Sequence, residues 1–268
     1  MRTVLVTGTS TGIGRATAER LSADGFHVLA GVRRAEDAPH GAEPVVLDVT
    51  DPAGIEAART RVAERGLFGL VNNAGITVQG PLEFLALDDF RRQLEVNLVA
   101  PLALTQALLP ALRASRGRIV MVSSVGGRTA LPFLGPYHAS KWGLEGLSES
   151  LRQEVEPLGV RVAIVEPGSA DTEIWRKGQA DVDDLLGALP PEGRELYGER
   201  MQAMRALAQT TAARAFPPAK VAAAIAHALS ARRPRPRYLV GADARAQVAL
   251  RAALPARAVD AAVRWLAR

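Results

Sequence analysis

The sequence predicts an α/β protein with a doubly wound parallel sheet of about seven strands in a three-layer α/β/α arrangement. Two observations predict it. Short β-branched runs alternate with helical stretches at regular intervals, the pattern of repeated βαβ units whose sheet is covered on both faces. The length of 268 residues, 48% of them hydrophobic, fits one large α/β domain or two small ones. Because no internal repeat or linker interrupts the pattern, we expect a single domain over residues 1–268.

The β-branched runs are short and recur along the whole chain, as strands of such a sheet do. The expected strands are residues 3–6, 27–32, 43–47, 69–72, 118–123, 160–166 and 237–240.

Helical stretches separate the first strands. The first expected helix covers residues 12–23 and closes at Gly25, a residue suited to the left-handed conformation after a helix. Asp51 is the expected N-cap of the next helix, Pro52 takes its first position, and the helix reaches about residue 63.

Two long helices are expected further along, at residues 88–112 and 137–158. In the second, Leu144, Leu147 and Leu151 follow one another at spacings of 3 and 4 residues. This spacing predicts a buried stripe on one side of the helix.

The late part of the chain departs from the βαβ rhythm. Residues 169–216 hold several Gly and Pro residues between short helical pieces, an insertion typical of a mobile lid over a site. Residues 243–268 form a C-terminal helical extension. We expect an interrupted amphipathic helix pair over residues 244–266 that packs beside the lid, lies on a membrane surface or meets a second subunit.

Composition excludes several kinds of chemistry. Without cysteine, the chain has no disulfide scaffold, thiolate zinc site or cysteine nucleophile. Its four histidines are scattered without metal-ligand spacing, so no metal is expected. Since no apolar stretch reaches about 18 residues and no signal-peptide design opens the chain, we expect a cytoplasmic protein without a membrane span.

The positive charge is concentrated near the C-terminus. The net charge is +5, and residues 232–268 hold nine arginines against Asp243 and Asp260. This excess is open to two interpretations: an anionic partner such as a membrane surface, or a solvated arginine-rich helix and loop. Because aromatic side chains are not interleaved with the arginines, the second is favoured and no nucleic-acid partner is expected. Peripheral membrane contact stays open.

A glycine-rich turn joins the first strand to the first helix. It reads Thr7-Gly8-Thr9-Ser10-Thr11-Gly12-Ile13-Gly14, with the spacing G-x-x-x-G-x-G. Glycines let the backbone approach a pyrophosphate, and the free amides at the start of the helix attract its charge. An ordinary tight turn is the alternative, but the position after the first strand of a βαβ series favours a dinucleotide site.

The end of the second strand indicates which dinucleotide. A free ribose 2′-hydroxyl would call for an acidic partner there. The chain has Val32 at the expected place, followed by Arg33 and Arg34. A guanidinium can hold a 2′-phosphate in two hydrogen bonds, so NADP(H) is favoured over NAD(H). The alternative is that both arginines are solvated loop charges.

Tyr137 and Lys141 form the most informative pair. At positions i and i+4 of a helix, their side chains lie on one face. A neighbouring cation favours the phenolate and should lower the phenol pKa, which makes the pair a tuned proton donor. Ser124 follows an expected strand at the edge where open parallel sheets bind ligands, and its hydroxyl could bond a substrate carbonyl. The adjacent Ser123 is more consistent with a structural role.

In these motifs the sequence resembles the short-chain dehydrogenase/reductase family, in its single-domain branch with a Rossmann-type fold. The resemblance covers nearly the whole chain. The motifs that carry it are Thr7-Gly8-x-x-x-Gly12-x-Gly14, Asp48-Val49, Asn72-Asn73-Ala74-Gly75, Asn97, Ser124, Tyr137-x-x-x-Lys141 and Pro167-Gly168 followed by Thr172.

The resemblance implies catalytic roles for four residues. Tyr137 is the general acid in reduction and the base in oxidation. Lys141 lowers its pKa and binds the nicotinamide ribose. Ser124 orients the substrate oxygen, and Asn97 anchors a water in a proton relay.

The resemblance also implies the cofactor contacts. Asp48 and Val49 would meet the adenine, and the turn before Thr172 would hold the nicotinamide end. Many NADP-using members carry a basic residue where Thr11 stands here, so the NADP prediction depends on Arg33. The implied cofactor-binding residues are Gly8, Ser10, Gly12, Ile13, Gly14, Arg33, Asp48, Val49, Asn73, Ala74, Gly75, Tyr137, Lys141, Pro167, Gly168 and Thr172.

A finer resemblance, to the retinol dehydrogenase and 17β-hydroxysteroid dehydrogenase group, lies in residues 25–31 and 237–265. It implies that the substrate is a bulky lipophilic alcohol or ketone. With the family motifs and Arg33, we expect hydride transfer between NADP(H) and a secondary alcohol or ketone of this kind, as in a ketoreductase or alcohol dehydrogenase. The alternative is a catalytically silent NADP-binding regulatory or interaction protein. The family resemblance also suggests a homodimer or homotetramer packed through the helices that begin at Asp88 and Tyr137.

Overall fold

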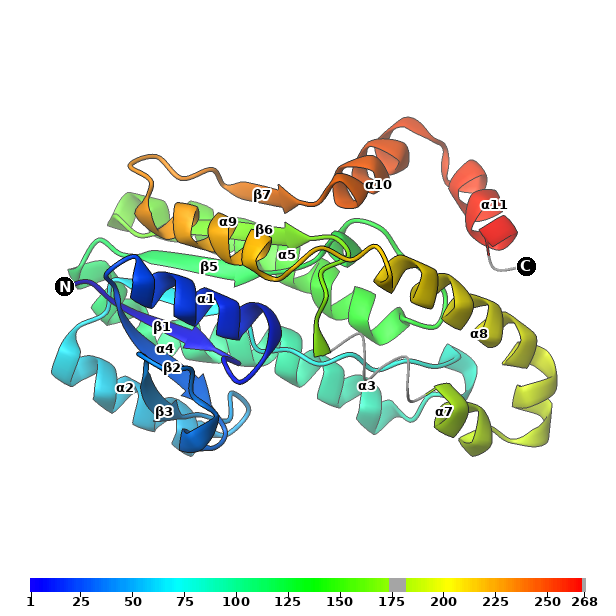
Figure 1. The fold of residues 1–268 in the computed structure, drawn as a ribbon, viewed down its shortest axis with the longest axis horizontal. Helices are drawn as coiled ribbons and strands as arrows, with labels where there is room; N and C mark the ends of the chain where they lie inside the picture. The colour runs from blue at the N-terminus through cyan, green and yellow to red at the C-terminus, as the bar shows by residue number, and fades with distance from the viewer. Residues whose placement is uncertain (174–181, 267–268) are drawn as a thin grey trace.

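The computed structural model describes residues 1–173 and 182–266. Its seven strands form one parallel sheet in the order β3-β2-β1-β4-β5-β6-β7 (Figure 1). After β1, strands β2 and β3 are added on one side of it, and strands β4 to β7 are added on the other side. The strands are β1 (Thr3–Thr7), β2 (His27–Val32), β3 (Glu43–Val46), β4 (Gly69–Asn72), β5 (Arg118–Val122), β6 (Arg161–Pro167) and β7 (Arg237–Val240).

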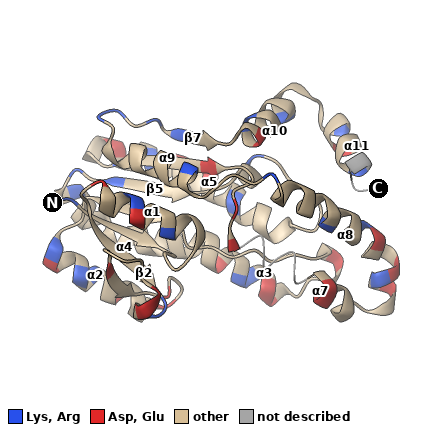
Figure 2. Ribbon diagram, viewed as in Figure 1, with Lys and Arg blue, Asp and Glu red and all other residues tan. Residues whose placement is uncertain are grey.

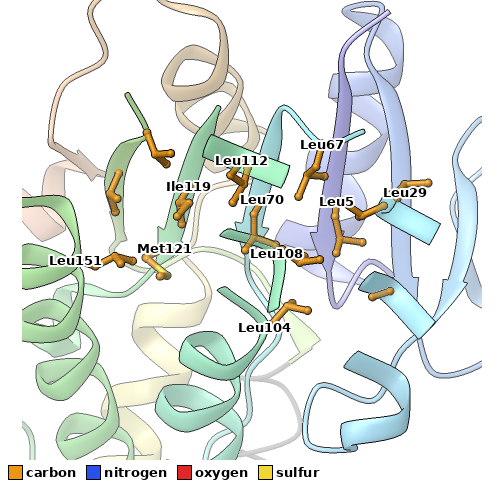
Figure 3. Packing of buried hydrophobic residues seen from close by; sticks show 14 of the residues in the cluster. Leu5, Leu29, Leu67, Leu70, Leu104, Leu108, Leu112, Ile119, Met121 and Leu151 are labelled. Atoms are coloured by element: carbon orange, nitrogen blue, oxygen red, sulfur yellow. The ribbon is translucent and has the colours of Figure 1, made fainter. Parts of the chain in front are cut away.

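Helices cover both faces of this sheet, which confirms the predicted doubly wound, three-layer fold. Neighbouring residues of each strand point to opposite faces, so Leu5 belongs to one core and Val4 to the other. The first core packs α2 (Pro52–Arg65), α4 (Ala100–Ala114) and α5 (Gly135–Val155) against the sheet (Figure 3). The second packs α1 (Gly12–Ala23) and α9 (Ala219–Ser230).

The helix expected at residues 88–112 is one continuous helical run, Leu87–Ala114, whose hydrogen-bond pattern changes within it. The chain runs through α3 (Leu87–Leu94), a π-helical turn at Glu95–Val99, and then α4. Pro101 has no N–H to donate, so the regular helical bond to the carbonyl of Asn97 cannot form. The wider turn accommodates this, since the amide of Ala100 bonds the carbonyl of Glu95.

In the described part of the chain, the run Leu87–Ala114 is the one helix long and apolar enough to cross a membrane. The prediction that no apolar stretch reaches about 18 residues was therefore wrong by this criterion. Three leucines of this run, Leu104, Leu108 and Leu112, are fully buried against the sheet, as in the core helix of a globular fold.

The insertion at residues 169–216 is more regular than predicted. In its described part, α7 (Val182–Ala188) precedes α8 (Pro191–Ala212), a helix of 22 residues where short pieces were expected. Gly193 and Gly198 lie inside α8 without ending it, because its other residues are good helix formers. Part of the expected lid, residues 174–181, lies outside the described residues.

Two helices follow β7, and they are the predicted interrupted pair: α10 (Ala242–Ala253) and α11 (Ala256–Leu266), separated at Pro255. With α8 they lie at the end of the molecule toward which the strands point, and α11 packs against α8 (Figure 1). The basic residues before β7 lie at the opposite end (Figure 2). The C-terminal arginines are therefore divided between two ends of the molecule.

Candidate active site

A cleft of about 1120 Å³ opens at the carboxyl ends of the strands, and all the predicted site residues line it. This is the place where open α/β sheets bind ligands, because the chain turns in opposite directions on either side of β1. The predicted residues in its wall are Gly8, Ser10, Gly12, Ile13, Gly14, Arg33, Asp48, Val49, Asn73, Ala74, Gly75, Asn97, Ser124, Tyr137, Lys141, Pro167, Gly168 and Thr172.

The glycine turn is shaped for close approach of a ligand. Gly8 and Gly12 have φ of 68° and 56°, which a side chain would strain. A Cβ on Gly14 would collide with the carbonyl oxygen of Gly8. The side chain of Thr11, the N-cap residue, makes no capping hydrogen bond to α1. The first amides of this helix can therefore bind an anion. These features fit a pyrophosphate.

Hydrogen bonds tie the turn after β4 to the turn after β1. The hydroxyl oxygen of Thr7 accepts from the amides of Asn73 and Ala74, both at 2.9 Å. The side chain of Asn73 donates to the carbonyl of Thr7 at 2.8 Å. Asn73 therefore shapes the cleft from behind, while Asn72 braces the sheet by donating to Thr105 at 3.1 Å. Sequence reasoning missed the role of Thr7.

The two arginines after β2 have different surroundings. Arg34 is bound to Asp37 by hydrogen bonds of 3.0 Å and is 69% exposed. Arg33 lines the cleft and makes no salt bridge within the described residues. Hydrogen bonds from Thr50 lower the pKa of Asp48, and the charge of Arg33 lowers it further, so this guanidinium lies near Asp48 in the cleft wall.

Tyr137 and Lys141 face the same cleft from the first two turns of α5. The Nζ of Lys141 donates to the carbonyl oxygen of Val122 at 2.9 Å and lies 5.8 Å from the centre of the Tyr137 ring. The Ser124 side chain is hydrogen-bonded to the phenol of Tyr137 and accepts from the amide of Gly126 at 3.0 Å. All three side chains are buried.

Burial, not the neighbouring ammonium, dominates the pKa values of this pair. It raises the pKa of Tyr137 to about 12, with the Ser124 bond acting in the opposite direction. It lowers the pKa of Lys141 to about 8, against the charge of Glu145. The prediction that the phenol pKa of Tyr137 is lowered is therefore wrong for the protein without a bound ligand. Desolvation of the phenolate, which raises this pKa, is the dominant effect. At neutral pH the phenol is protonated.

Asn97 sits in the π-helical turn and is 1% exposed. Its Oδ1 accepts from the amide of Ile76 at 2.9 Å, and its Nδ2 donates to the Ile76 carbonyl at 3.0 Å and to Ser140 at 3.2 Å. Both ends of the amide thus hold protein groups together. Its side chain locks α5 against the loop after β4.

A second cavity, of about 470 Å³, meets the cleft at Ser124 and Tyr137. Its wall is mostly apolar and comes from the loop after β5, from α7, from α8 and from both C-terminal helices. It includes Leu131, Phe133, Leu185, Met201, Met204, Leu207, Leu250, Val259 and Val263. No sequence motif marks this wall, because its residues come from segments far apart in the chain.

His138 is a further residue of this wall that sequence reasoning missed. Its Nε2 accepts from the amide of Leu131 at 2.9 Å, and its Nδ1 lies 2.8 Å from the carbonyl oxygen of Gly126. The ring thus pins the loop after β5 to the turn that carries Ser124. Burial lowers the pKa of His138, so the neutral ring makes these bonds.

Comparisons with known proteins agree with this geometry. A family model described as short chain dehydrogenase matches residues 2–183. Retinol dehydrogenase 5 of Mus musculus is 39% identical, over 98% of this chain and 88% of that protein. The NADPH-dependent 3-dehydrocapnine reductase of Ornithobacterium rhinotracheale is 36% identical, over 90% and 88%. A short chain dehydrogenase from Burkholderia cenocepacia, solved with NADP, superposes with a TM-score of 0.76 and 28% identity, over 98% of this chain and 99% of that one.

The chain belongs to the short-chain dehydrogenase/reductase family, with relatives among the retinol dehydrogenases. It is an NAD(P)-dependent oxidoreductase that acts on CH–OH or C=O groups. This conclusion disfavours the alternative of a catalytically silent binding protein.

Proposed function

We propose that the protein transfers a hydride between NADP(H) and a secondary alcohol or ketone on a bulky lipophilic molecule. The observation that carries this proposal is the place of Tyr137. Its phenol, hydrogen-bonded to Ser124, stands where the cleft and the apolar cavity meet. A carbonyl entering from the apolar side would reach both hydroxyls, with the dinucleotide on the other side.

Four residues of the site have separate roles in the proposed reaction. The nicotinamide, when bound, supplies or accepts the hydride. Ser124 donates a hydrogen bond to the substrate oxygen, and Tyr137 delivers the proton to that oxygen in reduction or removes it in oxidation. Lys141 holds a positive charge beside them, and Asn97 fixes α5 against the cleft.

The dinucleotide we propose is NADP(H), held by Arg33 at its 2′-phosphate. Unlike Arg34, Arg33 has no carboxylate partner in the described residues that would compete with a phosphate. The relative named as NADPH-dependent and the neighbour solved with NADP support this preference. The rest of the site also fits the part of the dinucleotide that NAD(H) and NADP(H) have in common.

The apolar cavity supports the lipophilic substrate. Its wall offers leucine, methionine and phenylalanine side chains, and Ser124 and Tyr137 stand where it meets the cleft. A hydrocarbon body gains roughly 25 cal/mol for each Å² removed from water, so this wall favours extended apolar molecules over small polar ketones. The described helices α7, α8, α10 and α11 supply this wall and would lie against the bound substrate.

A screen of carbonyl compounds tests the proposal. Oxidation of NADPH and NADH is followed spectrophotometrically with steroid ketones, long aliphatic ketones and aromatic ketones, and acetone serves as the small control. We expect turnover with a lipophilic ketone, a higher kcat/KM for NADPH, and little turnover of acetone. Equal rates for acetone and the lipophilic ketones would refute the substrate class, and a preference for NADH would refute the cofactor.

We extend the proposal to the setting of the protein: a single domain over residues 1–268, cytoplasmic, and assembled as a homodimer or homotetramer. The exposed face of the Leu87–Ala114 run and of α5 supports the assembly. Val99 and Trp142 on it are 44% and 49% exposed, and an interface would remove these apolar side chains from water.

A further inference from the structure

Three carboxylates converge on one guanidinium beside α5. Arg237, the first residue of β7, contacts Glu145 of α5 and Glu166 of β6 through Nη1. Its Nη2 lies 2.5 Å from Oε1 of Glu149. Arg128 adds a second guanidinium 3.3 Å from Oε1 of Glu166. The Glu145 and Glu166 side chains are 8% and 2% exposed, whereas Glu149 is 49% exposed.

This cluster adjoins the candidate catalytic residues. Glu145 lies one helical turn after Lys141 on α5. A Cβ built on Gly127 would lie 2.9 Å from the Cγ of Glu145 and 3.1 Å from the carbonyl oxygen of Lys141. The turn that starts at Ser124 is therefore packed directly against both residues.

Electrostatics connects the cluster to Lys141. Burial lowers the pKa of Lys141, and the charge of Glu145 opposes this effect. Burial also raises the pKa of Glu145, while Ser123 and Arg237 favour its ionised form and Glu166 disfavours it. The charge on Lys141 thus depends on Glu145, and the charge on Glu145 depends on Arg237.

We propose that Arg237 is a positioning residue for the reaction, which keeps Glu145 ionised so that Glu145 holds Lys141 as an ammonium beside Tyr137. The inference rests on the proposed function, in which the ammonium serves Tyr137 and the dinucleotide. It gives the edge strand β7 a part in catalysis, although none of its residues lines the cleft.

Two variants and a matched control test this role in the full-length protein. The proposed relay is the pair of charge interactions by which Arg237 acts on Glu145 and Glu145 acts on Lys141. Arg237→Met and Glu145→Gln each remove one member of this relay. Glu149→Gln removes the exposed carboxylate from the same guanidinium. For each protein, kcat for ketone reduction by NADPH is measured between pH 6 and pH 10, and the Kd of NADPH is measured over the same range by fluorescence.

We expect the alkaline limb of kcat to move to lower pH by about one pH unit in Arg237→Met and Glu145→Gln, the lower end of the effect of one neighbouring charge. Glu149→Gln should keep the profile of the parent protein, and Arg237→Lys should restore it in part. A uniform fall in kcat with an unmoved limb would overturn the proposal, as would a move to higher pH.

Folding and activity are controlled separately. If Arg237→Met does not fold, by circular dichroism, the nearly isosteric Glu145→Gln decides the question. If the parent protein reduces no carbonyl compound, the proposed function fails, and the pH dependence of NADPH binding then tests the relay without turnover. An unchanged pH dependence of that Kd in Glu145→Gln would refute the relay.

Discussion

The Nζ of Lys141 donates a hydrogen bond to the carbonyl oxygen of Val122, the last residue of β5. The bond joins the face of α5 that carries Tyr137 and Lys141 to the carboxyl end of the central sheet. Because both groups are buried, it holds the ammonium in place before any ligand arrives. The phenol of Tyr137 is positioned by the same helix, one turn earlier.

Tyr137→Phe should lower kcat for ketone reduction by about 100- to 10,000-fold, the usual contribution of a general acid. The Kd for NADPH should stay nearly unchanged, because the ring and its packing remain. Stopped-flow turnover and fluorescence titration measure the two quantities. Tyr197→Phe is the control, since its hydroxyl bonds Glu83 and Tyr197 lines neither cavity. Full activity in Tyr137→Phe would remove the assignment.

Arg33→Ala should raise KM for NADPH by roughly 10- to 100-fold, equivalent to the ~1.5–3 kcal/mol of hydrogen bonds to a charged group. KM for NADH should change little, because NADH has no 2′-phosphate. Arg34→Ala is the matched control, because Arg34 is engaged with Asp37. Equal effects on both dinucleotides in Arg33→Ala would argue against the phosphate contact.

His138 should make the protein less stable in acid. Its pKa is lowered by burial, so between pH 6.5 and that lowered value the unfolded chain takes up a proton that the folded chain does not. The free energy of unfolding should therefore fall as pH falls below about 6.5. Urea unfolding at several pH values measures this slope, which should be shallower in His138→Gln. The exposed His40, changed to Gln, should leave it unaltered.

Asp243 binds the start of α10 to the segment after β6, beside the cleft. Its Oδ2 accepts from the amide of Ser169 at 2.6 Å, next to Gly168 in the cleft wall. Asp243→Ala should cost about 1.5–3 kcal/mol in unfolding free energy and raise KM for the lipophilic ketone, because α10 is a wall of the apolar cavity. The exposed Asp260, changed to Ala, should have neither effect. An unaltered KM would show that α10 is held by other contacts.

Trp142→Glu should convert the assembled protein into a monomer, because a carboxylate in an apolar interface is left without water. Light scattering after size-exclusion chromatography measures the mass. Leu250→Glu, at an equally exposed leucine of α10, should keep the assembly. If the parent protein is itself a monomer, the assembly proposed through this face is excluded.

The sequence predicted local features well. The seven strands, the glycine turn and the Tyr137–Lys141 spacing depend on neighbours within one or two turns of chain, and all appear close to the expected positions. The long helix expected at residues 88–112 is present as Leu87–Ala114, but its π-helical turn was not predicted, because Pro101 changes the hydrogen-bond pattern inside a stretch of helical periodicity.

By itself, then, the sequence determined the fold class and the set of residues around the dinucleotide cleft, because backbone propensity and side-chain periodicity act over short distances. Only the tertiary structure decided the direction of the pKa shifts of Tyr137 and Lys141, the apolar cavity, and the contacts of Arg237 with Glu145 and Glu166. Burial and charge at those places come from groups far apart in the chain, such as Glu145 and Arg237, which are 92 residues apart. Desolvation depends on what surrounds a group in space, and no local pattern records it.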